Sequence, residues 1–291
     1  MTATFRPRFL SLVGGELMKI RHQWTTWILL LVQLGGILIL ALATLGAPQI
    51  KSNLLAHPTA WAYQMLDISQ VILGIGSGIF FLAVSARLVA MEYHHGTIRI
   101  LLARGVGRLQ LLAAQLVALV ICGVLFLALV GAIFAAFFAA SVNAWTGSLA
   151  TFQNLPASFW HDLRLSTLAA AISIGVCILL GTATAVLGRS LAFAVAAAMG
   201  FFPADNFGTI LLFLMQRITH SDTWLRVSDY LLGPNLNAVA QALEPGRRVN
   251  LAFASPAPPW DGNHTLVVVA VYCLLFVAIA VGLTARRDVL E

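Results

Sequence analysis

Long uncharged stretches recur along the chain, and their lengths predict helices that cross a membrane. A helix crosses about 30 Å of hydrocarbon with roughly 20 residues. Five stretches meet this requirement, and another meets it apart from an interruption at Pro203 and Asp205. Together they predict six transmembrane helices, at about 26–46, 66–88, 109–140, 165–187, 190–215 and 265–284. The fifth holds Pro203, Asp205 and Gly208, so we expect that helix to be broken near 203–208. The pattern predicts an all-α membrane protein with one transmembrane domain over residues 1–291.

The segment before the first stretch, residues 7–24, has a different pattern. Its apolar residues recur at helical spacing, at Phe9, Leu12, Val13, Leu17, Ile20 and Trp24. Glu16 and Lys19 lie off this stripe, so we expect an amphipathic helix in the inner membrane interface. A cleaved signal peptide is the alternative, because residues 41–43 read Ala-Leu-Ala, but five further stretches follow.

Two connections are expected to lie outside the cell. They cover residues 47–65 and 216–263. The second is expected to contain a short helix near 231–243 that Gly233-Pro234 interrupts. By contrast, the turn at 188–190 is so short that the fourth and fifth helices should form a tight hairpin.

Composition and charge support this topology. Charged residues make up 10% of the chain, against about 25% in soluble domains, and 60% of the residues are hydrophobic. Eleven of the 17 lysines and arginines fall in segments on the side of the N-terminus, and six on the other side. They are scattered between apolar stretches, which indicates membrane topology and not nucleic-acid binding. We expect a multi-pass protein of the cell (inner or plasma) membrane with both termini in the cytoplasm.

Small residues repeat every four positions in two of the predicted helices. The first stripe is Ala128, Ala132, Ala136 and Ala140, and the second is Ala169, Ser173, Cys177, Gly181 and Ala185. Small residues on one face let helices approach closely in a membrane. The two stripes are therefore expected to be packing seams, within one chain or between two.

The most highly charged interior segment, residues 85–113, lies between the second and third predicted helices. It contains four arginines and Glu92 among apolar residues. Charge at this density cannot lie in hydrocarbon, so the segment should meet the cytoplasm and present itself to a soluble partner.

Motifs for nucleotide or metal chemistry are absent from the sequence. No Gly-x-x-x-x-Gly-Lys-Ser/Thr loop occurs, and neither lysine, Lys19 or Lys51, follows a glycine. We therefore do not expect the chain to be an enzyme or to hydrolyse nucleotide by itself. Glu92, His94 and His95 are too irregularly spaced to bind a metal from one helix face.

The charged segment resembles the cytoplasmic signature of ABC type-2 permeases. Its matching residues are Glu92, Gly96-Thr97, Arg99, Leu101-Leu102 and Arg108. The similarity extends to the N-terminal Glu16, Lys19 and Arg21, to the six predicted helices, and to the closing Arg286-Arg287-Asp288. Many members of that family have proline where Gly105 stands, so the turn before Arg108 is expected to differ.

This resemblance implies the membrane-spanning subunit of an ATP-driven exporter that moves a hydrophobic or amphipathic substrate out of the cytoplasm. Its implied partners are two copies of an ABC ATP-binding subunit, which would bind the ATP and Mg²⁺, and a second permease subunit, identical or homologous. The segment would form a coupling helix seated on the ATPase. Its contact or positioning residues would be Glu92, Gly96, Thr97, Arg99, Arg104 and Arg108.

A proton-coupled secondary transporter is the alternative from another functional class. Asp205 would lie about 22 Å along the fifth helix, and it could face a cavity together with Asn206 as part of a substrate path. Asp67 is a second candidate carboxylate. The simpler explanation of Asp205 is a helix that ends at Pro203–Gly208.

Overall fold

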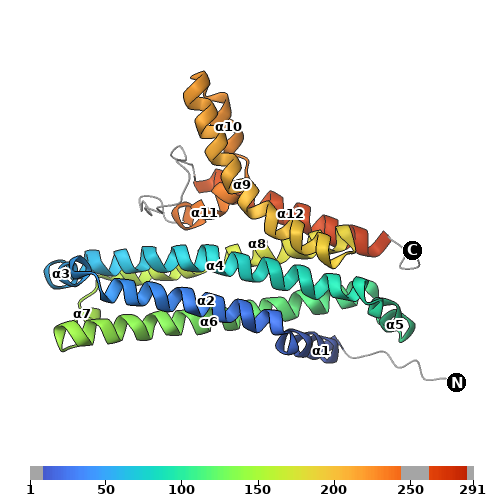
Figure 1. Cartoon of the computed structure of the whole chain (residues 1–291), viewed down its shortest axis with the longest axis horizontal. Helices are drawn as coiled ribbons and strands as arrows, with labels where there is room; N and C mark the ends of the chain where they lie inside the picture. The colour runs from blue at the N-terminus through green and yellow to red at the C-terminus, as the bar shows by residue number, and fades with distance from the viewer. Residues whose placement is uncertain (1–8, 244–261, 287–291) are drawn as a thin grey trace.

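The computed structural model describes residues 9–243 and 262–286, and every regular element in these ranges is a helix. Four long helices lie side by side and alternate in direction (Figure 1). They are α2 (Trp24–Leu45), α4 (Pro58–His94), α6 (Arg108–Thr146) and α8 (Ala157–Gly188). The short helices α3 (Pro48–Ala56) and α7 (Ala150–Gln153) lie at one end of this bundle, and α1 (Phe9–His22) and α5 (Thr97–Ala103) lie toward the other.

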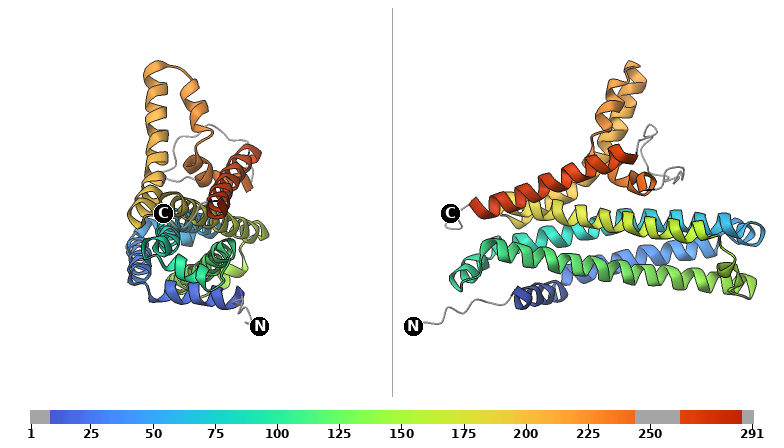
Figure 2. Two further views of the ribbon diagram at one scale, coloured as in Figure 1. Left: turned by 90° about the vertical axis from the view of Figure 1, so that its right-hand side faces the viewer. Right: turned by 180° about the vertical axis from the view of Figure 1, so that it is seen from behind.

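The last third of the chain adds four more helices. They are α9 (Leu191–Thr219), α10 (Thr223–Ser228), α11 (Leu232–Leu243) and α12 (Gly262–Arg286). Figure 2 shows that the second half of α9 and α10 form a hairpin that points away from the bundle. The end of α12 lies at the same end of the bundle as α5.

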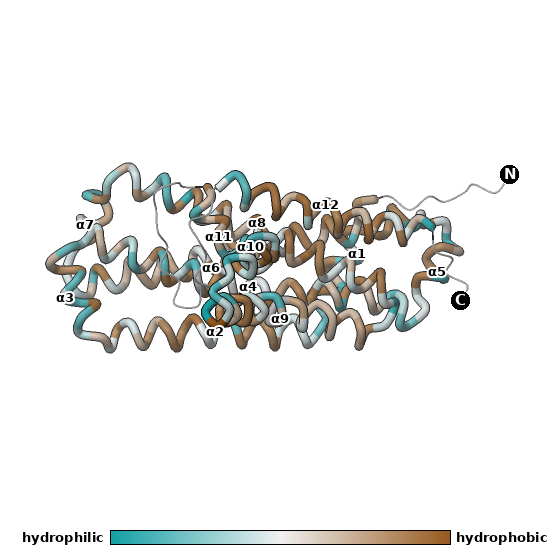
Figure 3. The backbone as a smooth tube through the Cα atoms, turned by 90° about the horizontal axis from the view of Figure 1, so that it is seen from above, coloured by the Kyte–Doolittle hydropathy of each residue, from teal (hydrophilic) through white to brown (hydrophobic). Residues whose placement is uncertain are grey.

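Five of the described helices are long and apolar enough to cross a membrane, namely α2, α4, α6, α8 and α12. Their surfaces are rich in exposed apolar side chains, such as Leu31 and Ile39 on α2 and Leu274 on α12. Figure 3 shows hydrophobic positions along the middle of the bundle and hydrophilic ones toward α3, α7 and α5. These features fit an all-α membrane protein.

The expected break in the fifth span is not a break in the structure. Residues 191–219 form one helix, α9, which bends sharply along its length (Figure 1). Its apolar parts on either side, Leu191–Phe201 and Phe207–Thr219, are each shorter than a membrane span. A proline lacks a backbone N–H and disfavours the turn before it, so a proline inside a helical segment can kink the helix without ending it.

Several helices extend beyond the limits that the sequence indicates. Helix α4 begins at Pro58 and α3 precedes it, so the expected loop over 47–65 is mostly helical. An uncharged stretch predicts only the part of a helix that lies in the hydrocarbon of the membrane, and the helix can continue beyond it at either end. A separate apolar cluster holds the extensions together, with Trp61 on α4, Val142 on α6 and Phe159 on α8. Its Trp61 ring also contacts Phe138 edge to face, at 6.2 Å between centroids.

Helix α11 is also more regular than expected. Gly233 and Pro234 do not interrupt it, because they fall in its first turn. A proline there removes an N–H that has no partner within the helix anyway.

The buried face of α1 differs from the predicted apolar stripe. Val13, Glu16 and Ile20 are buried, whereas Phe9 and Trp24 are exposed. The helix is present as expected, but a glutamate lies at the centre of its packed face.

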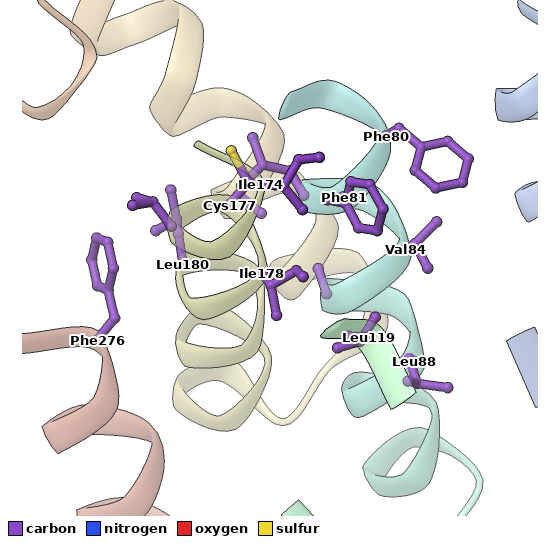
Figure 4. Close-up of a cluster of buried hydrophobic side chains, with 14 of the residues drawn as sticks. Phe80, Phe81, Val84, Leu88, Leu119, Ile174, Cys177, Ile178, Leu180 and Phe276 are labelled. Atoms are coloured by element: carbon purple, nitrogen blue, oxygen red, sulfur yellow. The ribbon is translucent and has the colours of Figure 1, made fainter. Parts of the chain in front are cut away.

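The two stripes of small residues have different environments. The α8 stripe is buried, and it faces α4 in the main core (Figure 4), where Phe81 and Cys177 are enclosed. The α6 stripe is exposed along its whole length. At Gly181 on α8, an added Cβ would meet the Ser85 side chain and lie 2.9 Å from the Leu82 carbonyl oxygen of α4. At Gly131 on α6 it would meet nothing within 4 Å.

We predict that Gly181→Ala destabilises the purified protein in mild detergent and that Gly131→Ala does not. Gly181→Ala should lower the free energy of unfolding by about 1–3 kcal/mol, because the new methyl group forces α4 and α8 apart. Gly131→Ala should leave it unchanged or raise it by up to about 1 kcal/mol through helix propensity. Thermal unfolding of both variants measures the difference, and equal effects would contradict the close α4–α8 seam.

Candidate functional site

The site begins at the sharp turn between α4 and α5. Gly96 adopts φ 66°, a left-handed conformation that glycine reaches at little cost, and the turn reverses the chain at the end of the bundle. After α5, Gly105 has φ 85° and its N–H donates to the Leu102 carbonyl at 2.9 Å. Proline fixes φ near −65°, so a proline at 105 could not form this turn. The turn before Arg108 therefore requires a residue that can adopt positive φ, which glycine does at little cost.

Glu92 lies one turn before this corner and is enclosed, with 4% of its surface exposed. One of its carboxylate oxygens accepts a hydrogen bond from Lys19 Nζ of α1, and the other accepts one from the hydroxyl of Thr97, the first residue of α5. Lys19 Nζ also lies 2.7 Å from Glu16 Oε1. One ammonium therefore ties α1 to α4, and one hydroxyl ties α4 to α5. We call Glu16, Lys19, Glu92 and Thr97 the α1–α4–α5 cluster.

The charges of this cluster are unequally exposed to water. Burial raises the pKa of Glu16 above its ordinary value, although Lys19 acts in the opposite direction. Burial by itself would lower the pKa of Lys19, but its hydrogen bonds to Glu16 and Glu92 outweigh that effect and raise it. The desolvation cost thus falls on Glu16, whose side chain is 3% exposed, and less on Lys19, whose side chain is 40% exposed. Lys19 stays protonated at neutral pH and neutralises one of the two carboxylates.

Helix α5 has an inner and an outer face. On the inner face, Ile98 packs against Val106 and Leu111 in a small apolar cluster. On the outer face, Arg99, Ile100 and Arg104 are exposed. The outer face combines positive charge with an apolar side chain, which suits contact with a protein surface.

Arg108, at the start of α6, is half-buried and faces inward. It lines a cavity of about 10 Å³ together with Glu92, Gln115 and Thr284. The structure therefore brings Glu92 and Arg108 together behind α5, bonds Thr97 to Glu92, and leaves Arg99 and Arg104 on the surface.

Asp205 belongs to a different part of the fold, on α9 (Figure 1). Its carboxylate accepts the backbone N–H of Gly233 in the first turn of α11. The carboxylate supplies a hydrogen-bond acceptor for an N–H that has no acceptor within its own helix. The side chain of Asn206 lies outside the described part of the structure, and Asp67 lies on α4 toward the end opposite α5.

Sequence reasoning missed that Glu16 and Lys19 belong to the same site as Glu92. The signal available was local: a glutamate and one of only two lysines lie three residues apart on a predicted helix. Nothing in the sequence connects Lys19 with Glu92, which is 73 residues away.

Comparison with known proteins identifies one family. Residues 52–290 match a family described as "Protein of unknown function (DUF2705)". No curated protein matches the chain. The matched range includes Glu92 and α5, whereas α1 with Glu16 and Lys19 precedes it.

We predict that Lys19→Met destabilises the protein by about 1–3 kcal/mol, because it removes the ammonium that two enclosed carboxylates share. The loss should be smaller than for a fully buried ion pair, since water reaches Lys19. Thermal unfolding in detergent measures it, with Lys51→Met at the exposed end of the bundle as the matched control. Adding Glu16→Gln and Glu92→Gln to Lys19→Met should recover part of the loss. Equal stability of Lys19→Met and Lys51→Met would show that the cluster has no structural role.

Proposed function

We propose that this chain, which belongs to the DUF2705 family of proteins of unknown function, is the membrane-spanning permease subunit of an ATP-driven ABC exporter. It would use two copies of a separate ATPase subunit, which bind ATP and Mg²⁺, and a second permease subunit. The cargo would be hydrophobic or amphipathic. The single observation that carries the proposal is the way in which α5 is attached to the bundle. Its outer face is exposed, and its first residue, Thr97, donates a hydrogen bond to the enclosed Glu92.

This attachment of α5 suggests how movement of a partner would reach the long helices. Helix α4 has 37 residues and is about 55 Å long. A push on the outer face of α5 would reach the last turn of α4 through Thr97 and Glu92, and α1 through Lys19. Because Ile98 also anchors α5 by packing, the short helix would move together with α4 and not swing freely. Nucleotide-driven movement of the ATPase would then tilt the long helices and change access to the substrate path.

The orientation is part of the proposal. The α5 end carries Lys19, Arg21, Arg99, Arg104 and Arg189 among its described residues, and positive residues favour the cytoplasmic side. Both termini would then lie in the cytoplasm, and the α5 face would meet a soluble ATPase. Arg287 and Asp288, which complete the expected C-terminal anchor, lie outside the described residues.

Proton-coupled transport through Asp205 has less support. The carboxylate already accepts the N–H of Gly233, which gives it a structural role at the start of α11. Transport that follows an imposed pH gradient without ATP, and that Asp205→Asn abolishes, would favour this alternative.

We predict that the chain co-purifies with a P-loop ATPase when it is extracted gently from native membranes. Mass spectrometry should find that subunit in near-stoichiometric amount. If the protein runs alone as a folded monomer or dimer under several mild detergents, the exporter proposal fails.

We further predict that Arg99→Glu uncouples the ATPase from transport. The variant should still insert into the membrane, but the charge reversal on the outer face of α5 should lower substrate-stimulated ATP hydrolysis or partner retention by about tenfold. The matched control is Arg164→Glu, which reverses an exposed arginine on α8 near the opposite end. Wild-type coupling in Arg99→Glu would remove α5 from the partner interface.

A further inference from the structure

A groove opens where α9 bends. Its volume is about 500 Å³, and it lies between the two halves of α9 and the link that leads into α11. Phe201 comes from the first half of α9, Leu211 and Leu212 come from the second, and Leu231 comes from the link. The groove follows the bend of α9, which Figure 2 shows as a change of direction between the two halves of the helix.

Among the described residues that line this groove, Asp205 is the one that carries a charge. Its Oδ2 accepts the N–H of Gly233, and no ion pair with a described residue neutralises it. Arg217, further along α9, lies over the ring of Phe213 at 4.7 Å. A carboxylate among apolar side chains is costly unless a positive charge approaches it. The groove is therefore complementary to a positive charge on a hydrophobic body.

We propose that this groove binds a lipophilic organic cation, with its hydrophobic body against Phe201, Leu211 and Leu212 and its charge beside Asp205. The inference rests on the proposed function and names the class of cargo that the exporter would carry. Inorganic cations suit the groove less well: Ca²⁺ takes six to eight oxygen ligands and the lining supplies one carboxylate, and a hydrated Mg²⁺ would gain nothing from the apolar walls. Lipophilic anions of the same shape are repelled by the carboxylate.

The test is equilibrium binding of radiolabelled tetraphenylphosphonium to the purified full chain in phosphatidylcholine nanodiscs, with empty nanodiscs subtracted. Tetraphenylborate, which has nearly the same shape and the opposite charge, serves as the matched probe. We expect saturable binding of the cation and no saturable binding of the anion. Equal affinity for the two ions would overturn the proposal.

Two variants separate charge from shape. Asp205→Asn keeps an oxygen that can accept the Gly233 N–H, and it should weaken binding of the cation by about tenfold or more. Asp222→Asn, before α10 and away from the groove, should leave the affinity unchanged. Gly208→Leu should abolish binding by filling the groove, since an added Cβ there meets nothing within 4 Å and the fold can accept it. Gel filtration confirms that each variant is folded.

The outcomes also distinguish this inference from the proposed function. If the ATPase co-purifies but tetraphenylphosphonium does not bind, the exporter proposal stands and the cargo class is wrong. If the cation binds through Asp205 and no ATPase is found, the groove is supported and the exporter proposal fails. A lipid acyl chain or a second copy of the chain in the groove would prevent saturable binding, and that result would overturn the inference.

Discussion

One lysine ammonium, shared between two enclosed carboxylates, holds together the end of the bundle where three helices meet. Lys19 lies between Glu16 and Glu92, and Thr97 donates to the same Glu92 from the next helix. Removing Lys19 would take the ammonium from both carboxylates, and removing Glu92 would take the carboxylate from both Lys19 and Thr97. The positions of α1, α4 and α5 are therefore interdependent, and the exposed face of α5 is presented in one orientation.

The rest of the molecule provides a stiff support for that corner. The α4–α8 seam has no room for a single added methyl group at Gly181, and the main core includes the enclosed Phe81 and Cys177. Such a seam transmits displacement because close-packed interiors deform little. By contrast, the exposed stripe on α6 and most of α2 have no partner within the described chain and suit contact with lipid or another subunit.

The two candidate sites use carboxylates in opposite ways. The carboxylate of Glu92 accepts hydrogen bonds from the Lys19 ammonium and the Thr97 hydroxyl, and it thereby links α1, α4 and α5. Asp205 receives only a backbone N–H from the described chain, and it borders an open apolar groove. The first arrangement fixes helices relative to one another, and the second leaves a negative charge available to something that enters from outside.

Local chemistry in the sequence was enough to predict the helical class, the amphipathic helix before the first span and the exposed basic segment around Arg99, because hydropathy and charge act over a few turns. It failed where distant residues meet. Glu16 was assigned to the polar side of α1, yet it is buried, since Lys19 bridges it to Glu92 from another helix. Asp205 could be recognised as unusual, but its N–H partner and the groove depend on the bend of α9 and the position of α11. Only tertiary packing decides which charges are brought together, because side chains far apart in the chain meet only after the helices have packed.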